Sequence, residues 1–200
     1  MANKPLAIGC LMIVLVVALI GAVYVTSVYN SLVGLDQKVQ AQWGQVENTY
    51  QRRADLIPNL VETVKGAAAF EQDTFTAVTE ARAKVGQVQV NAGQLTPEAL
   101  AQFQQAQDGL SSALSRLLVV VEKYPELKAT EAFKELQAQL ESTENRITVE
   151  RMRFNETAQA FNTRRNRFPA ALVAGFFSKF AEKSYFKAQA GAETAPKVKF

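Results

Sequence analysis

The chain has 200 residues, a formal net charge of +3, no histidine and one cysteine. The lack of histidine excludes catalytic triads, histidine general bases and the common histidine-containing zinc sites, and a single cysteine cannot form a disulfide within the chain. The weak positive charge is far below that of a nucleic-acid-binding domain, so we expect no nucleic-acid partner. A hydrophobic share of 48% still allows a buried core, and the length fits one domain plus an anchor.

The first predicted element is a membrane-spanning helix near the N-terminus. Residues 6–25 are uncharged, and no charge occurs between Lys4 and Asp36. This length matches one bilayer crossing of about 30 Å, whereas the apolar core of a cleaved signal peptide has only about 7 to 15 residues. We therefore expect a retained anchor over residues 1–28. Lys4 and the terminal amine outnumber Lys38, so the positive-inside rule predicts a cytoplasmic N-terminus and an extracytoplasmic domain.

A helical stripe follows the span without a break. Its apolar or small positions recur at steps of three and four, about 3.67 residues per turn, which predicts one nearly straight helix that continues the membrane helix. Pro58 removes one backbone hydrogen bond, so we expect a kink there and not the end of the helix. The stripe consists of Leu32, Leu35, Val39, Trp43, Val46, Tyr50, Ala54, Ile57, Val61 and Val64.

Two further helices are predicted in the middle of the chain. A weaker pattern covers residues 71–88, and residues 91–93 are typical of a turn. Thr96 and Pro97 then supply an N-cap and a first helical position. The seam of this third helix has alternating steps of three and four, as antiparallel packing requires. It consists of Leu100, Phe103, Gln107, Leu110, Leu114, Leu117 and Val121.

Two prolines bound the last long helix. Pro125 ends the third helix and begins a fourth, because proline disfavours helix in the preceding residue and fits a first turn. So short a connection predicts an antiparallel hairpin. Pro169 is expected to end the fourth helix and to open a short fifth one over residues 170–180. The seam of the fourth helix repeats every seven residues at Phe133, Leu140, Ile147, Phe154 and Phe161.

These elements predict an all-α fold. Residues 29–167 are expected to form a long antiparallel up-down-up-down four-helix bundle, preceded by the N-terminal transmembrane helix. Residues 168–200 are expected to form a Phe/Lys-rich segment with the short fifth C-terminal helix and a tail. Because the first helix leaves the membrane, the fourth helix returns to it.

The returning helix brings a basic and aromatic segment near the lipid surface. This composition suits an interfacial amphipathic helix, but the same rings can equally cap the bundle or fill a subunit interface. The sequence leaves both interpretations open. The candidate membrane-surface residues are Arg164, Arg165, Arg167, Phe176, Phe177, Lys179, Phe180 and Lys183.

A polar cluster around Pro58 is the candidate site inside the bundle. One interpretation is a polar pocket for a ligand or a neighbouring subunit. The other is a buried ion-pair network with Glu144 or Arg146 of the fourth helix, which we favour because polar members of bundle cores commonly fix helix register. The cluster consists of Arg52, Arg53, Asp55, Asn59 and Glu62.

Other chemistry has little support in the sequence. A di-metal site in a bundle needs histidine, calcium loops need a regular acidic spacing, and nucleotide sites need a glycine-rich phosphate loop. We therefore expect no catalytic, cofactor-binding or metal-binding residues.

Several motifs together resemble the LemA family. The resemblance covers nearly the whole chain and implies a bacterial membrane protein with one N-terminal span and an antiparallel helical bundle. It implies no catalytic residues, and roles in envelope stress and membrane maintenance go with it as suggestions. The motifs are YNSLV at 29–33, Trp43 with QVE at 45–47, QRRADLIPNLVETVKG at 51–66, LLVVVEKYPELK at 117–128, TENRI at 143–147 and PKVKF at 196–200.

The predicted function is that of a non-enzymatic, membrane-anchored scaffold or adaptor in the bacterial inner membrane. Its expected partners are the lipid bilayer, a second copy of itself and other membrane proteins. Self-association is expected because Leu56 and Leu60 widen the apolar stripe of the first helix beyond the need of one core. The alternatives are a lipid-binding or membrane-shaping protein acting through the Phe/Lys segment, and a hydrolase built on carboxylates with Arg52 and Arg53.

Overall fold

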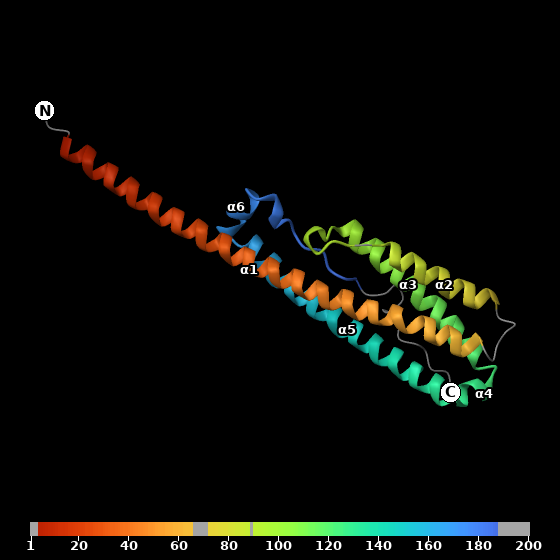
Figure 1. Ribbon diagram of the computed structural model, residues 1–200. Coiled ribbons are helices and arrows are strands. Elements are labelled where there is room, and N and C mark those ends of the chain that lie inside the picture. The colour runs from red at the N-terminus through yellow and green to blue at the C-terminus, as the bar shows by residue number, and fades with distance from the viewer. Residues whose placement is uncertain (1–3, 66–71, 89, 188–200) are drawn as a thin grey trace, which may run out of the picture.

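The computed structural model describes residues 4–65, 72–88 and 90–187, and every regular element in these ranges is helical (Figure 1). The all-α prediction is therefore confirmed for this part of the chain. The long helices are α1 (Lys4–Lys65), α2 (Gln72–Gln87), α3 (Pro97–Val121) and α5 (Glu131–Asn166). The short ones are η1 (Ala92–Gln94), α4 (Pro125–Ala129), α6 (Ala170–Gly175) and η2 (Ser178–Phe180).

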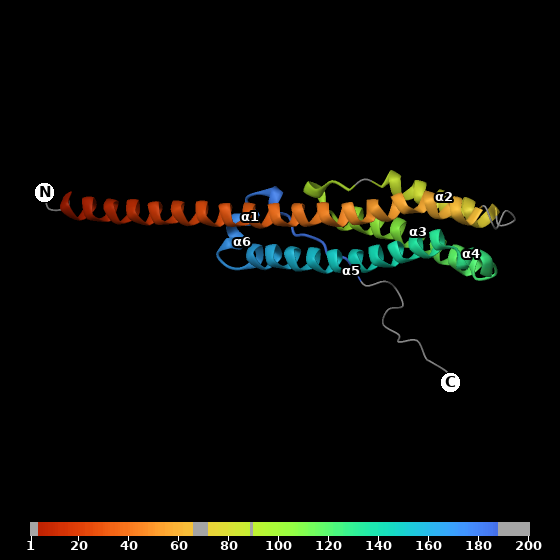
Figure 2. The same ribbon diagram turned by 60° about the horizontal axis from the view of Figure 1, so that its bottom comes forward.

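Helix α1 joins the apolar N-terminal segment to the domain as one uninterrupted helix. At 1.5 Å per residue, its 62 residues extend over about 93 Å. Leu11 and Val23 are 68% and 69% exposed, whereas Val28 is buried. Figure 2 shows this segment projecting beyond the other helices. The prediction of an N-terminal helix apolar and long enough to cross a bilayer is confirmed.

The long helices lie in two neighbouring pairs, α1 beside α5 and α2 beside α3 (Figures 1 and 2). The helices of each pair run in opposite directions. The core between them consists of two clusters. In the membrane-proximal cluster, the Trp43 ring contacts the rings of Phe103 and Phe154 at centroid distances of 5.2 and 5.6 Å. The distal cluster includes Ile57 of α1, Leu117 of α3 and Leu140 of α5.

The hydrophobic periodicity predicts the buried faces well. All the predicted seam positions of α3 are buried, including the polar Gln107. All the seven-residue positions of α5 are buried as well. The Thr96 hydroxyl accepts a hydrogen bond from the Ala99 N–H at 3.2 Å, so the predicted N-cap of α3 is confirmed.

Helix α1 continues through Pro58 to Lys65, as the sequence predicts. Proline has no N–H, so the carbonyl of Ala54, four residues earlier, loses its helical donor. The Arg82 guanidinium of α2 takes that place, with its Nε donating to the Ala54 carbonyl at 3.0 Å. A buried carbonyl without a donor is costly, so this contact compensates for the proline.

Two predicted helix boundaries are wrong. The expected fourth helix is divided at Thr130, which ends α4 with an extended backbone and caps α5, its hydroxyl accepting from the Phe133 N–H at 3.4 Å. The expected fifth helix stops at Gly175 instead of continuing to Phe180. The physical reason is tertiary: Phe177 is extended and its ring packs edge-to-face on Tyr29, at a centroid distance of 5.1 Å.

The surplus apolar surface expected on the first helix is covered within the chain. Leu60 is fully buried in the distal core, and Leu56 is half-buried against that core. The sequence argument for self-association from these two leucines therefore does not hold.

Candidate functional site

Arg53 is the most deeply buried ionisable side chain that the structure describes, at 2% exposure. Its Nη1 donates to Glu144 Oε1 of α5 at 2.5 Å and to Ser111 Oγ of α3 at 3.0 Å. Its Nη2 donates to the backbone carbonyl of Gln107 at 3.3 Å and also to the Gln107 side-chain oxygen. One guanidinium thus connects three helices, and we call Arg53, Gln107, Ser111 and Glu144 the Arg53 network.

Charge balance in the Arg53 network is uneven. Arg53 is desolvated, whereas the Glu144 side chain is 46% exposed, so water weakens the attraction between the two charges. The Tyr50 ring lies against the guanidinium at 5.1 Å and adds a cation–π contact. Neutral acceptors from α3 complete the set of partners. This arrangement fixes the register of α1 against α3 and α5 and leaves Arg53 little capacity to bind a ligand.

Burial raises the pKa of Tyr50 above its ordinary value, although Arg151 and Arg53 act in the opposite direction. The phenol therefore stays protonated at neutral pH. A protonated, buried phenol is a poor nucleophile and a poor general base.

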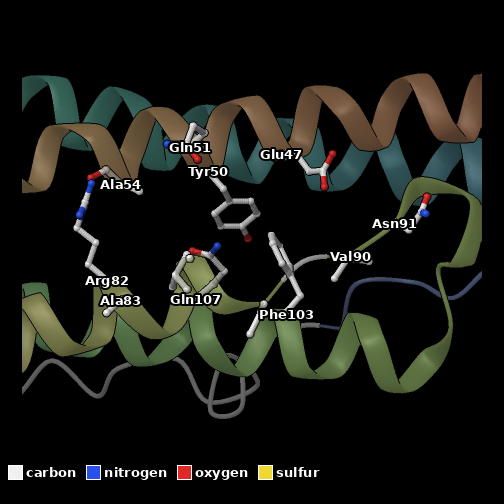
Figure 3. Close-up of a pocket in the computed structure, with 13 residues that line it drawn as sticks. Glu47, Tyr50, Gln51, Ala54, Arg82, Ala83, Val90, Asn91, Phe103 and Gln107 are labelled. Carbon is white, nitrogen blue, oxygen red and sulfur yellow. The ribbon is translucent and has the colours of Figure 1, made fainter.

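An open cavity of about 730 Å³ lies between α1 and the α2–α3 pair (Figure 3). The Tyr50 side chain extends from α1 toward Phe103 and Gln107 of α3, and Arg82 reaches from α2 to Ala54. Its wall is mixed, with polar groups making up somewhat more of the surface than rings and aliphatic side chains. The lining residues are Glu47, Tyr50, Gln51, Ala54, Arg82, Ala83, Val85, Gly86, Val88, Val90, Asn91, Phe103 and Gln107.

A second cavity of about 400 Å³ is lined by Arg53, Glu144 and Phe186, and it shares Tyr50 and Gln107 with the first. The Arg53 network therefore lies between the two open cavities. This feature makes the middle of the domain polar while both core clusters remain apolar.

The structure places only one member of the predicted polar cluster in the core. Arg53 is buried and paired with Glu144, one of the two partners expected from the fourth helix. The other members are exposed on the surface of α1: Arg52, Asp55, Asn59 and Glu62. Gln107 belongs to the predicted α3 seam but lies outside the polar cluster predicted from the sequence. The sequence signal for Gln107 was its polar side chain, because every other position of the α3 seam is apolar.

The last described residues, 181–187, form an extended segment that we call the C-terminal strap. Asn162 of α5 pairs with the Lys183 backbone in both directions, donating to its carbonyl at 2.8 Å and accepting from its N–H at 2.8 Å. Asn155 pairs with Phe186 in the same way, at 3.1 and 2.9 Å. The two asparagines thus supply the hydrogen bonds that a neighbouring strand would supply.

The spacing of these pairs has a simple geometric origin. Three extended residues cover about 10 Å, and seven helical residues cover about the same distance. Lys183 and Phe186 are three apart, whereas Asn162 and Asn155 are seven apart, so both pairs form at once. The strap therefore runs antiparallel to α5.

An ion pair attaches the C-terminal strap to α1. Lys183 Nζ lies 2.6 Å from Asp36 Oδ1, with side-chain exposures of 6% and 14%. The ammonium also faces the Phe161 ring at 5.0 Å. Truncating either partner would leave the other charge desolvated, so this contact holds the strap firmly.

The predicted membrane-surface residues separate into three groups. Phe180 and Lys183 are buried within the chain. Arg164 and Arg165 are half-buried. Arg164 donates to Ser31 Oγ at 3.3 Å, and Arg165 donates to the Phe180 carbonyl at 2.6 Å. The exposed ones are Arg167, Phe176, Phe177 and Lys179.

Metal binding finds no support among the residues that the structure describes, because no group of three or more His, Cys, Asp or Glu side chains is placed to hold an ion.

The fold and these contacts define a class: a protein that is all-helical over its described residues and whose candidate membrane-spanning helix continues directly into its domain. The profile described as LemA family matches residues 42–200. The chain therefore belongs to the LemA family, as the sequence motifs indicate.

Similar proteins include magnetosome proteins of Paramagnetospirillum magneticum and Magnetospirillum gryphiswaldense. Magnetosome proteins MamQ 1 and MamQ 2 of Paramagnetospirillum magneticum are each 27% identical over 185 residues, covering 83% of this chain and 67% of the relative. Magnetosome protein MamQ of Magnetospirillum gryphiswaldense is 27% identical over 170 residues, covering 74% of this chain and 62% of the relative.

Proposed function

We propose that this LemA-family protein is a membrane-anchored, non-enzymatic scaffold or adaptor of the bacterial inner membrane that serves envelope maintenance or stress. The observation that carries the proposal is the continuity of α1, which runs from the exposed apolar segment into the core without a break. A continuous helix transmits position along its axis, so the domain stands at a fixed height above the bilayer. A catalytic role has weaker support. Arg53 is the most buried cation among the described residues, and its guanidinium already donates hydrogen bonds within the chain.

We infer that α1, α2, α3 and α5 close as an antiparallel up-down-up-down bundle. Both core clusters support this inference, because each contains side chains from α1, α3 and α5. The Arg53 network supports it as well, since it connects the same three helices.

The scaffold role includes self-association. Its support is the pair Val149 and Met152, which lie one turn apart on α5 outside the membrane segment, at 39% and 55% exposure; Val119 on α3 is a further exposed apolar side chain, at 61%. Exposed apolar side chains that adjoin one another favour contact with another protein.

Light scattering coupled to size exclusion tests this role on the full chain in mild detergent at micromolar concentration. We expect a protein mass that is a multiple of the 22.0 kDa chain and that falls toward one chain in Met152→Glu. Gln159→Glu, at an exposed polar position of the same helix, is the matched control and should change nothing. A monomeric mass for the unmodified protein would refute self-association.

The domain is proposed to lie on the extracytoplasmic side. The support is the positive-inside rule applied to Lys4 and the terminal amine against Lys38. Protease added to intact spheroplasts should digest the domain, and full protection would reverse the orientation.

A further inference from the structure

The membrane-proximal end of the domain carries three large apolar side chains that point away from the core. Phe168, Leu172 and Phe176 are 83%, 60% and 85% exposed. Leu172 lies on α6 and Phe176 is its helical C-cap residue, so these two share one face, and Phe168 lies just before the helix. We call these three residues the α6 apolar face. The opposite side of α6 is buried through Ala170, Val173 and Ala174.

The height of this face above the membrane follows from α1. Tyr29 lies four residues beyond Val25, the last residue of the apolar run 6–25, which is about 6 Å along a helix. The headgroup layer extends about 5 to 8 Å beyond the hydrocarbon core on each side. Tyr29 therefore lies at headgroup depth.

The segment after α6 is fixed at the same depth. The Phe177 ring contacts the Tyr29 ring at 5.1 Å, and Lys179 Nζ donates to the Tyr29 hydroxyl at 2.7 Å. Figure 1 shows α6 beside α1 where the apolar part of α1 leaves the domain. The α6 apolar face is therefore exposed next to the point where α1 enters the bilayer.

We propose that the α6 apolar face inserts into the headgroup and upper acyl region of the anionic bilayer in which α1 is anchored. Charge favours this occupant: apart from the buried Lys183, which pairs with Asp36, the chain from Arg164 to Lys187 has five basic residues and one acidic residue, Glu182. Exposed Arg167 and Lys179 flank the face, as cations do beside interfacial apolar side chains. The domain thus has a second contact with lipid besides the span, and this contact sets its tilt.

This inference rests on the membrane anchoring proposed above, and the experiment separates the two. The full chain carrying Phe176→Trp is reconstituted in nanodiscs of phosphatidylcholine and phosphatidylglycerol, with one protein per disc. The matched control is Ala129→Trp, which places tryptophan at an exposed, uncharged site on α4, at the end of the domain far from the span. Both variants keep the buried Trp43 as a common background.

The expected result for Phe176→Trp is blue-shifted emission from the introduced indole and quenching by brominated phospholipid, stronger with bromine near the headgroup than near the acyl end. The Ala129→Trp control should show neither effect beyond that of the unmodified chain. A chain that fails to enter nanodiscs would refute the anchoring itself. The insertion would be overturned if the Phe176→Trp chain entered nanodiscs but its new indole stayed unquenched. Red-shifted emission would then place that indole in water, and blue-shifted emission would place it in contact with protein.

Discussion

At the residue scale, the domain depends on a few buried polar side chains whose partners come from other helices. Arg53 is the main example, because its guanidinium binds to α3 and α5 while its backbone belongs to α1. The network is asymmetric, since Arg53 is buried and Glu144 is half-exposed. Loss of the cation should therefore cost more than loss of the anion.

We expect Arg53→Ala to lower the free energy of unfolding by about 3 kcal/mol, because it removes a buried group with several hydrogen bonds and leaves a cavity. Glu144→Gln should lower it by about 1 kcal/mol or less, since the exposed carboxylate is screened by water and the amide keeps an acceptor oxygen. Denaturant titration of the detergent-solubilised full chain measures both. Equal effects would contradict the asymmetry of the network.

The buried phenol of Tyr50 predicts a pH effect. Its pKa is raised in the folded state, so the folded protein holds this proton more tightly than the unfolded chain. Stability from this group is fully present below about pH 10 and is lost as the pH rises through the raised pKa. Melting temperatures measured from pH 9 to above pH 10 should fall less in Tyr50→Phe than in the unmodified protein. An identical fall in the two would show that Tyr50 is not responsible.

At the element scale, α1 combines an interior proline with an unbroken helix. The Ala54 carbonyl, which Pro58 deprives of its donor, accepts from Arg82 of α2. Arg82 also lines the larger cavity, so the same contact fixes the position of α2 over α1 and holds one wall of that cavity.

This pairing predicts a thermodynamic coupling. Arg82→Met should lower the free energy of unfolding by about 1 kcal/mol in the natural chain, because the Ala54 carbonyl loses its donor. In a Pro58→Ala background the restored N–H supplies that donor, so the same substitution should have little effect. A double-mutant cycle measures the coupling. Additive effects would mean that Arg82 does not compensate for the proline.

The C-terminal strap is an element that no local pattern predicts. Its seven residues have neither helical nor strand periodicity, and the backbone hydrogen bonds of Lys183 and Phe186 go to asparagine side chains of α5. The C-terminal tail predicted from residue 190 onward lies outside the described residues.

At the scale of the whole molecule, the span and the domain share one helix but not one core. Residues 9–27 are exposed, whereas Val28, Leu32 and the half-buried Tyr29 contact the domain. The fold should therefore survive removal of the span.

We expect a chain that begins at Thr26 to keep its helical circular dichroism and a melting temperature close to that of the full protein in detergent. A chain that begins at Asp36 is the control, and it should melt at a lower temperature because it lacks Val28, Tyr29 and Leu32. Loss of helical signal in the longer of these two chains would contradict the separation of span and core.

The sequence by itself determined the helices, their buried faces and the candidate span, because periodicity and apolar length are properties of consecutive residues. The repeats through Trp43, Leu110 and Phe154 each identify a buried face without reference to any other segment. The N-cap at position 96 and the proline at position 97 likewise affect only the first turn of the helix that they begin.

Only the tertiary structure decided which polar and aromatic residues face inward. Phe176 and Phe180 have the same chemistry and lie four residues apart, yet one is 85% exposed and the other fully buried. The difference arises because the chain turns at Phe177 to meet Tyr29, far away in sequence. Arg52 and Arg53 differ for the same reason, since only the second faces Gln107, Ser111 and Glu144. Such contacts depend on how distant segments pack, and no local pattern contains that information.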